Sequence, residues 1–378
     1  MKITQLQNCT GCHACINSCS GAAITMHEDN EGFLYPNIDE NKCVTCKLCE
    51  KICPVLNQEE PAQPLAVYAA KNNNLKERLK SASGGIFPLL AKEIIAAGGV
   101  VFGACFDMLW NVKHTYIQQI DKIDWLKGSK YLQSIIGDTY FKVELFLKAG
   151  KTVLFSGTPC QIAGLRKFLQ QEYPNLYTVD LVCHGVPSPK IWRQYLKETV
   201  NQEDIASVVF RDKQYSWQAY NVTILGKAGK KLFSEPYSKN SYMRGFIQNL
   251  YLRPSCHNCP TKQLKSQSDI TLGDFWGIQN LYPDFNDDKG INVVFVNTPK
   301  GADLLKKLDA TFMETDYRKA INANAMVEQS VKAHLKRKLF FHLFDKKEKT
   351  VSQLVEKLLH KSFMDKVKGK IKRFLKIL

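Results

Sequence analysis

The sequence predicts a mainly α/β protein with α+β elements, preceded by a small cysteine-rich module and followed by a helical extension. Three observations lead to this prediction. A run of four cysteines occurs twice within residues 1–60, strand-like and helix-like segments alternate across residues 65–320, and lysines flank an apolar helical stripe within residues 321–378. A length of 378 residues suits two or three such units. We expect the middle unit to comprise two parts, 65–150 and 151–320.

The first module carries the pattern Cys-x2-Cys-x2-Cys-x3-Cys twice, and each cysteine recurs 34 positions later. In this motif, three closely spaced thiolates bind one four-iron cube, and the fourth reaches the other cube. We therefore assign cluster I to Cys9, Cys12, Cys15 and Cys53, and cluster II to Cys43, Cys46, Cys49 and Cys19. The module is predicted to be a bacterial-type 2[4Fe-4S] ferredoxin domain that carries electrons.

Other uses of these cysteines fit the spacing less well. A zinc ribbon needs two Cys-x2-Cys pairs and leaves the remaining cysteines without a role. Residues two or three apart seldom reach disulfide geometry. The opening residues MKITQLQ do not have the form of a secretory signal, so thirteen cysteines indicate a reducing cytoplasm. Ser20 stands where Pro54 follows the second run, but that proline turns the chain and does not bind iron.

Charge is unevenly divided between this module and the rest of the chain. Residues 1–60 have a net charge of −4 within a chain of net charge +16, which leaves about +20 elsewhere. Complementary surfaces steer redox partners toward one another, so we expect a small ferredoxin or a partner subunit. Nucleic-acid binding is not expected, because no helix-turn-helix, finger or RNP-type motif accompanies the charge. No run of 18 apolar residues predicts a membrane span.

The elements of the middle unit follow from the alternation of apolar segments after a polar, proline-bearing linker at 57–64. Before the linker, residues 22–26 and 32–35 predict short strands. The strands expected after it are 65–70, 100–106, 113–120, 152–156, 177–183, 206–211, 221–225, 269–273 and 292–297. The expected helices are 85–97, 139–148, 161–170, 190–200, 242–250 and 301–308. Their alternation favours α/β, and the hairpin 206–225 adds an α+β element.

Four further cysteines lie at points where an α/β sheet collects ligands. Cys160 and Cys183 each lie where a predicted strand gives way, through a Gly/Pro turn, to a helix, and Cys256 and Cys259 form a Cys-x2-Cys pair in a loop. Ligands gather outside the carboxyl ends of such strands. These four thiols could hold a third [4Fe-4S] cluster, with structural zinc and unligated thiols as the alternatives. Cys105, within an apolar strand, is expected to be a small core residue.

Two polar loops offer groups that bind anions. The sequence Ser81-Ala82-Ser83-Gly84-Gly85 opens a predicted helix, where free N–H groups favour a phosphate, although Ser and Gly also serve as ordinary caps. Residues 127–134 offer cations and amides suited to a flavin ring or a diphosphate, or form a plain surface loop. Clusters pass single electrons whereas most metabolites accept two, and a flavin commonly bridges the difference. No GxGxxG motif in a βαβ setting supports a Rossmann site.

Together these motifs resemble the coenzyme F-420 hydrogenase/dehydrogenase beta-subunit family, preceded by a dicluster ferredoxin domain. The resemblance covers roughly residues 1–300 and rests on several motifs in order. These are Ser83-Gly84-Gly85, GSKYLQS at 128–134, SGTPCQ at 156–161, CHGVPSP at 183–189, Cys256-x2-Cys259-Pro260 and DITLGDFWG at 269–277. Residues 320–378 lie mostly outside it.

The resemblance implies an iron–sulfur flavoprotein oxidoreductase that binds FAD. Family members reduce coenzyme F-420 or act as formate dehydrogenase beta subunits or chlorophyll-pathway reductases, and similar chains occur among bacterial polysaccharide-biosynthesis proteins. Because these substrates are diverse, the small-molecule substrate stays unidentified. The resemblance implies flavin contacts by Ser83, Gly84, Gly85, Lys130, Tyr131 and Gln133, and it adds weight to the third cluster. His184 is a candidate proton donor or a hydrogen-bonding support, with Lys130 and Tyr131 as alternative acids.

Three functions are therefore open. In the first, a reductase passes electrons from a ferredoxin or partner subunit through the clusters to FAD and a two-electron acceptor. The second is a non-catalytic electron-transfer subunit. The third is a scaffold of a membrane-associated glycan assembly complex, using the basic amphipathic segment 350–378 on an anionic membrane or a partner. The alternative for this stripe is that it packs on its own domain, with the lysines in solvent. We expect a cytoplasmic protein, or one peripheral to the inner face of the membrane.

Overall fold

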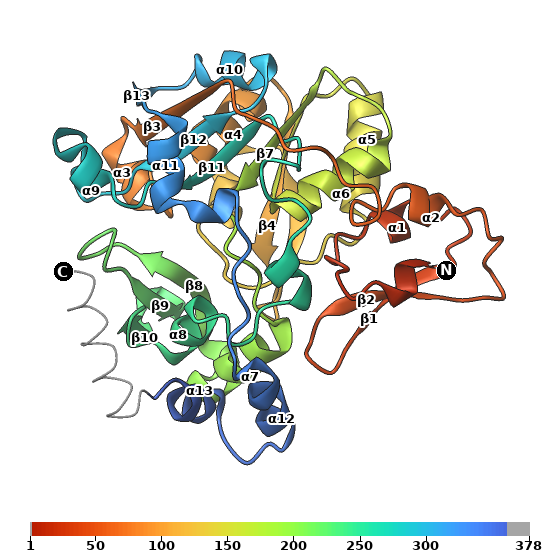
Figure 1. Ribbon diagram of the computed structural model, residues 1–378. Coiled ribbons are helices and arrows are strands. Elements are labelled where there is room, and N and C mark those ends of the chain that lie inside the picture. The colour runs from red at the N-terminus through yellow and green to blue at the C-terminus, as the bar shows by residue number, and fades with distance from the viewer. Residues whose placement is uncertain (1, 361–378) are drawn as a thin grey trace, which may run out of the picture.

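A computed structural model describes residues 2–360, which form an eight-stranded, a three-stranded and a two-stranded sheet with surrounding helices (Figure 1). The strands are β1 (Ile24–Glu28), β2 (Leu34–Ile38), β3 (Ala66–Asn72), β4 (Val100–Phe106), β5 (Val112–Ile117), β6 (Val153–Gly157), β7 (Leu176–Leu181), β8 (Ile205–Asp212), β9 (Asn221–Gly226), β10 (Lys231–Pro236), β11 (Ile270–Asp274), β12 (Asn292–Val296) and β13 (Ala310–Glu314). The helices are α1 (Ala14–Asn17), α2 (Leu48–Lys51), α3 (Leu75–Leu79), α4 (Ile86–Ala96), α5 (Thr139–Lys148), α6 (Pro159–Leu169), α7 (Pro189–Thr199), α8 (Ser241–Ile247), α9 (Ile278–Leu281), α10 (Pro299–Leu305), α11 (Tyr317–Ala323), α12 (Arg337–Asp345) and α13 (Val351–Leu359).

The large sheet has the order β13-β3-β12-β11-β7-β6-β4-β5. Strands β11, β7, β6 and β4 are parallel, whereas β3, β5, β12 and β13 pair antiparallel with their neighbours. A parallel centre with antiparallel edges is the α/β fold with α+β elements that the sequence predicts. The three-stranded sheet pairs β8, β9 and β10 antiparallel, so the expected hairpin is present with one more strand.

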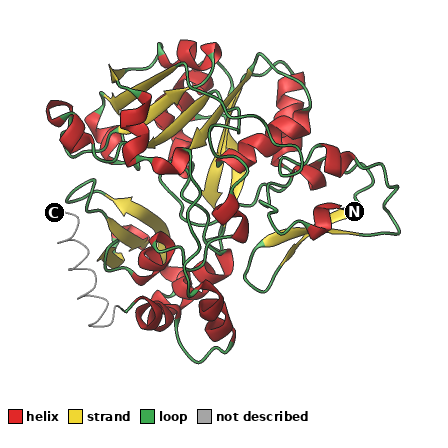
Figure 2. Ribbon diagram, viewed as in Figure 1, coloured by secondary structure: helices red, strands yellow, loops and turns green. Residues whose placement is uncertain are grey.

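Alternation along each strand divides the large sheet into two covered faces (Figure 2). In β4, Val101 joins the core under α4 and α10, whereas Val100 and Phe102 join the core under α5 and α6. In β12, Val294 and Phe295 likewise point to opposite faces, because successive strand residues do so. The parallel strands therefore lie between helical layers, with their carboxyl ends directed to a common edge.

The three-stranded sheet packs with α7, α8, α12 and α13 around an aromatic core that includes Trp192, Phe210 and Tyr242. The apolar stripe of α13 is part of this core, since Val351, Leu354, Val355 and Leu358 are buried in it. Within the described residues, the C-terminal segment thus packs on its own domain. The rest of the expected stripe, residues 361–378, lies outside the described residues. No helix within residues 2–360 has the length and apolarity to cross a bilayer.

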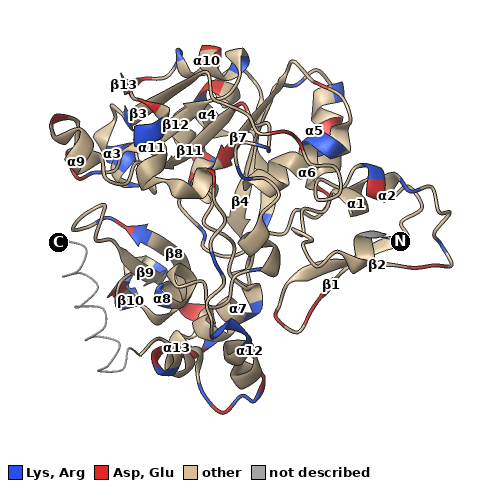
Figure 3. Cartoon of the chain, viewed as in Figure 1, with Lys and Arg blue, Asp and Glu red and all other residues tan. Residues whose placement is uncertain are grey.

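The cysteine-rich module docks on the body through its β1–β2 hairpin, where Figure 3 shows acidic residues. Glu28 pairs with Arg193 of α7 at 2.6 Å, and Glu31 pairs with Arg337 of α12. Lys190 Nζ also donates to the Asn30 carbonyl at 2.7 Å. The charge contrast seen in the sequence is therefore used, at least on this hairpin, to hold the module against its own chain.

Candidate metal centres

The two cysteine runs fold into two copies of one loop. In the first copy Gly11 and His13 have left-handed backbone, each with φ of 65°, and α1 follows. In the second copy Thr45 and Lys47 have φ of 53° and 60°, and α2 follows. Non-glycine residues seldom adopt this conformation, so its recurrence 34 positions later is a structural repeat and not a coincidence of spacing.

The four thiols assigned to cluster I lie close together. Burial raises the pKa of the Cys12 thiol to about 12, and negative charge on Cys9 and Cys53 contributes. Burial also raises the pKa of Cys15, with contributions from the same neighbours. The convergence includes Cys53 from the second run, as the motif predicts. Buried thiols of this kind fit a [4Fe-4S] cluster, because iron supplies the positive charge that keeps them ionised.

The thiols assigned to cluster II lie nearer the surface. Burial raises the pKa of Cys49, and charge on Cys46 and Cys43 adds to the rise. Cys19, from the first run, packs on the small core that contains Cys49. Cys46 is exposed and Val44, two residues before it, is 78% exposed, whereas Cys49 of the same set is buried. The second set therefore reaches the surface at Cys46, and none of the first set is exposed.

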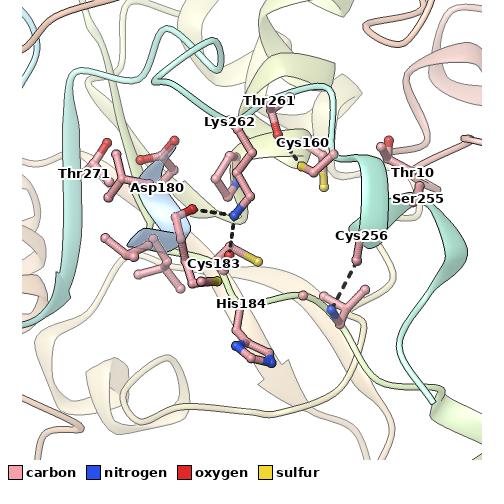
Figure 4. Close-up of a pocket in the computed structure, with 18 of the residues that line it drawn as sticks. Thr10, Cys160, Asp180, Cys183, His184, Ser255, Cys256, Thr261, Lys262 and Thr271 are labelled. Carbon is pink, nitrogen blue, oxygen red and sulfur yellow. Dashed lines mark hydrogen bonds between the residues drawn. The ribbon is translucent and has the colours of Figure 1, made fainter. Parts of the chain in front are cut away.

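The other four predicted ligands line a single pocket at the carboxyl edge of the large sheet (Figure 4). Cys160 is in the first turn of α6, which Thr158 and Gln161 cap reciprocally. Cys183 lies just after β7. Cys256 is in the short helix Pro254–Asn258, and Cys259 directly follows that helix. The fold thus brings together residues from three separate segments, as the strand–turn–helix pattern predicts.

The charges of these four thiols are coupled. Burial raises the pKa of Cys160 well above its usual value, and charge on Cys259, Cys183 and Cys256 adds to the rise. The Val186 amide donates to Cys256 Sγ at 3.4 Å, a contact typical of cluster ligands. Four converging thiols match the ligand number of a [4Fe-4S] cube and also that of a structural zinc site, so both alternatives from the sequence stay open.

Two ionisable side chains lie in the same pocket. Lys262 Nζ donates to the carbonyl oxygens of Cys183 and Met326, and its charge opposes the rise that burial causes in the Cys183 pKa. Asp180 is 1% exposed, and one of its carboxylate oxygens accepts from Ser266. Burial raises the pKa of Asp180 to about 6. The pocket therefore combines a fixed cation with a carboxyl group that desolvation makes easier to protonate.

His184 also lines the pocket, but its ring is held by another side chain. Its Nε2 lies 2.6 Å from Asn249 Oδ1, and Asn249 Nδ2 donates to the Lys332 carbonyl at 2.9 Å. Burial lowers the pKa of His184. This chain of contacts ties the Cys183 loop to a distant segment and favours the supporting role of His184 over that of proton donor.

The pocket and the cluster I cysteines share a wall. Gly164 in α6 lies so close to Cys12 that a Cβ atom there would be 3.1 Å from its sulfur. Tyr140 donates to the Gln161 carbonyl at 2.7 Å, and charges on both Cys12 and Cys160 raise its pKa beyond the larger effect of burial. Thr10, in the first cysteine loop, lines the pocket itself. The two thiol sets are therefore neighbours across the first turns of α6.

Comparison with known proteins agrees with this arrangement. Residues 150–319 match the family model for the C terminus of the coenzyme F420 hydrogenase/dehydrogenase beta subunit, and residues 8–57 match a 4Fe-4S dicluster domain. The resemblance and the dicluster prediction are thereby confirmed. Residues 8–57 are similar to iron–sulfur dicluster domains, and residues 150–319 are similar to the C-terminal part of coenzyme F420 hydrogenase/dehydrogenase beta subunits.

One solved structure similar to this chain is a chain of the F420-reducing [NiFe] hydrogenase complex from Methanosarcina barkeri. The two chains are 18% identical, with a TM-score of 0.48 over 79% of this chain and 94% of that chain.

The loop at residues 81–85, which is expected to contact a flavin phosphate, is packed tightly inside the protein. Ser83 Oγ donates to the Ile291 carbonyl at 2.9 Å, and Ile86 N donates to Asn292 Oδ1 at 3.3 Å. A Cβ atom at Gly84 would lie 2.5 Å from the Ala70 carbonyl oxygen. Contact with β3 and β12 therefore explains Gly84 without a ligand.

The second expected flavin loop divides its side chains among different neighbours. Lys130 Nζ donates to the carbonyls of Lys127 and Gly128, and burial lowers its pKa to about 8. The Tyr131 ring packs on Phe210 and Phe246. Gln133 Nε2 instead donates to the Thr10 carbonyl at 3.0 Å. Gln133 thus contacts the cluster I loop, whereas Lys130 and Tyr131 lie within the body.

Two basic residues that sequence reasoning missed connect the expected flavin segments. Arg211, 5% exposed, pairs with Asp274, and its Nη1 lies 3.5 Å from the Tyr131 hydroxyl. Lys213 Nζ donates to the carbonyl oxygen of Ser83 at 2.9 Å. Arg211 lies near the end of β8, and Lys213 directly follows the strand. Their role depends on contacts with segments that are distant in the sequence, so the sequence alone does not indicate it.

The buried amine of Lys213 predicts how the free energy of unfolding depends on pH. Its Nζ also donates to the Arg78 and Lys289 carbonyls, and burial, with the nearby Arg211, lowers its pKa to about 7. Between pH 7 and its ordinary pKa of 10.5 the unfolded chain binds a proton at Lys213 that the native chain does not. The free energy of unfolding therefore rises with pH in this window, and below it the cost of burying the charge is fully present.

We expect Lys213→Met to flatten that rise. Near pH 10, where the native amine is neutral, it should also lower stability by about 1–3 kcal/mol, because buried carbonyls lose their donor. Anaerobic calorimetry of the cluster-loaded protein from pH 7 to about pH 10 measures both effects. Lys306→Met, at an exposed position paired only with Asp303, is the matched control. Parallel pH curves for Lys213→Met and the wild type would contradict the prediction.

Proposed function

We propose that the protein is an oxidoreductase that receives single electrons from a ferredoxin or partner subunit and passes them through three [4Fe-4S] clusters to FAD. The observation that carries this proposal is the shared wall between the two inner thiol sets, where Cys12 packs on the helix that begins at Cys160. Neighbouring clusters are what a chain of single-electron steps requires. An unidentified small molecule, on the resemblance one of bacterial polysaccharide biosynthesis, accepts the electrons in pairs.

The exposure of the thiols gives this route a direction in space. Cluster II, with the exposed Cys46, is the point of contact for the electron donor. Cluster I, with the buried Cys12, hands electrons to the cluster held by Cys160, Cys183, Cys256 and Cys259. Lys262 places positive charge beside that set and favours its ionised thiolates. The iron–sulfide cores, when bound, supply the redox chemistry, and the chain's own residues hold and insulate them.

FAD is the proposed two-electron partner because the clusters deliver electrons singly. Support comes from the resemblance, which implies flavin contacts in the Ser83 loop and at Tyr131, and from the neighbouring residues Lys213 and Arg211, which contact these two segments. Lys130, with a pKa lowered by burial to about 8, is the proposed proton donor of this region, ahead of His184.

One observation favours a second candidate, an electron-transfer subunit that holds no flavin. Two expected flavin contacts already have partners within the protein: Ser83 Oγ donates to the Ile291 carbonyl, and Gln133 Nε2 donates to the Thr10 carbonyl. The glycan-assembly scaffold has less support, because the apolar residues of α13 are buried in their own domain.

Anaerobic purification, with iron, sulfide and flavin quantified on one sample, tests the proposal. About twelve irons, from three four-iron clusters, with one bound FAD would support it. About eight irons and no flavin, after FAD has been offered, would refute it and leave a dicluster carrier. About twelve irons without flavin would select the electron-transfer subunit.

A further inference from the structure

Arg253 lies wholly buried between the dicluster module and the third set of cysteines. It is 0% exposed, and its side chain donates to the carbonyls of Cys9 at 2.7 Å and Leu34 at 2.8 Å. A third bond, at 2.9 Å, goes to Gln133 Oε1. The guanidinium also lies 4.3 Å from the centre of the Tyr35 ring. Every one of these side-chain contacts, apart from Gln133, is with the dicluster module.

The backbone of Arg253 belongs to the other centre. Its carbonyl accepts from the Cys256 amide at 3.0 Å, and its amide donates to the Val186 carbonyl at 2.9 Å. Arg253 lines the pocket that Cys256 and the other thiols of the set share. One residue therefore holds the cluster I loop with its side chain and the third thiol set with its main chain.

Among the residues that the structure describes, no carboxylate pairs with Arg253. Four arginines are buried among residues 2–360, and the other three each pair with an acidic residue: Arg78 with Asp287, Arg211 with Asp274 and Arg337 with Glu31. An unpaired buried charge is costly, and such charges are normally compensated. The charge of Arg253 lowers the pKa of Cys256 against the larger effect of burial, and its side chain donates to the carbonyl of Cys9, so ligands of both centres lie within its reach.

Glycine at position 11 completes the arrangement. Gly11 has φ of 65°, and a Cβ atom there would lie 2.9 Å from both Arg253 Nη1 and Gln133 Nε2. The absence of a side chain lets the guanidinium approach the turn that contains Cys9 and Cys12. The first cysteine loop is therefore shaped to receive this cation closely.

We propose that Arg253 is the shared counter-ion of cluster I and the third cluster, and that it raises the reduction potentials of both. Each electron added to a cluster adds a negative charge, which a fixed cation in a low-dielectric surrounding stabilises. Arg253 is thus a positioning and potential-setting residue, not a catalytic one. The third-cluster part rests on the proposed function, whereas the part concerning cluster I does not.

Three variants, studied by EPR-monitored redox titration with iron counted on each sample, test this role. Arg253→Met removes the charge, Arg253→Lys keeps it, and Gln133→Glu supplies the carboxylate that Arg253 lacks. We expect Arg253→Met and Gln133→Glu to shift the midpoint potential of cluster I to more negative values, and Arg253→Lys to stay near the wild type. Arg337→Met, which removes a docking arginine that already has a carboxylate partner, should leave the potentials unchanged.

Unchanged potentials in either Arg253→Met or Gln133→Glu would overturn the proposal. An equal shift in Arg337→Met would also overturn it, because that result would assign the effect to loosened docking. Should Arg253→Met lose its clusters, Gln133→Glu decides the question, since it retains the arginine. If the third cluster does not form at all, the wild type will contain about eight irons. The shift in the midpoint potential of cluster I can still be measured in that case.

Discussion

Cys256→Ala is expected to remove one whole cluster and to leave the other two in place. The thiol is buried in the pocket, receives the Val186 amide hydrogen bond, and is distant in sequence from both runs of the dicluster module. A four-iron cluster that loses one of its four protein thiolates is poorly held, so iron should fall from about twelve to about eight per chain. EPR spectra of the reduced variant should retain the signals of the two dicluster centres. Electron delivery to any acceptor beyond the pocket should fall to background.

Cys105→Ala is the matched control for that substitution. Cys105 is also a buried cysteine, but it belongs to the core under α4 and to neither thiol set. Its removal should leave the iron content and electron delivery unchanged, with a modest loss of stability from the missing sulfur. Loss of a single zinc ion from Cys256→Ala would establish the structural-zinc alternative. Unchanged metal content would show that the four thiols are unligated.

The dicluster domain could be predicted from the sequence because its information is local. The spacing within residues 9–19 and 43–53 identifies the motif, and it also predicts which thiols share a cube, with Cys19 and Cys53 exchanged between the runs. The central strands were predictable for a similar reason, since their apolar residues form unbroken runs. Strand β10 was missed because Lys231–Pro236 mixes charged and apolar residues and is only partly buried. Strand β13 was missed because it lies at the sheet edge, where one side of the strand is not covered.

The contacts between segments could not be predicted in this way. Arg253 precedes a Pro-Ser-Cys sequence and carries no local sign that it will contact Cys9, which is 244 residues away. Gly84 shows the converse problem. A glycine before a helix is compatible with a phosphate site, yet here close approach of the Ala70 carbonyl is sufficient to require it. A glycine in the sequence can indicate that there is no room for a side chain, but only the folded structure shows which group restricts the space.

The docking of the dicluster module should be lost in Gly32→Ala while its clusters remain bound. Gly32 has φ of 91°, and a Cβ atom there would lie 2.3 Å from Lys190 Cβ and 2.8 Å from Ser188 Oγ. The left-handed backbone would cost about 1–3 kcal/mol, and the clash with the start of α7 would add about 1–3 kcal/mol. Because Glu31 beside it pairs with Arg337, displacement of this loop also weakens that ion pair. The cysteine loops lie elsewhere in the module, so both dicluster centres should still form.

Rapid-freeze EPR distinguishes lost docking from lost clusters. After an external donor reduces cluster II, electrons should reach the third cluster of Gly32→Ala at least about tenfold more slowly, the factor that corresponds to 1.4 kcal/mol. Gly150→Ala is the control for backbone strain alone, since Gly150 has φ of 73° and open space around its Cβ position. It should lose some stability but keep the wild-type rate. If both variants slow electron transfer equally, the contact of Gly32 with α7 is not what holds the module in place. If neither does, the contact of Gly32 with α7 is dispensable, and the contacts of Arg253, Gln133 and α6 with the first cysteine loop are sufficient to hold the two centres together.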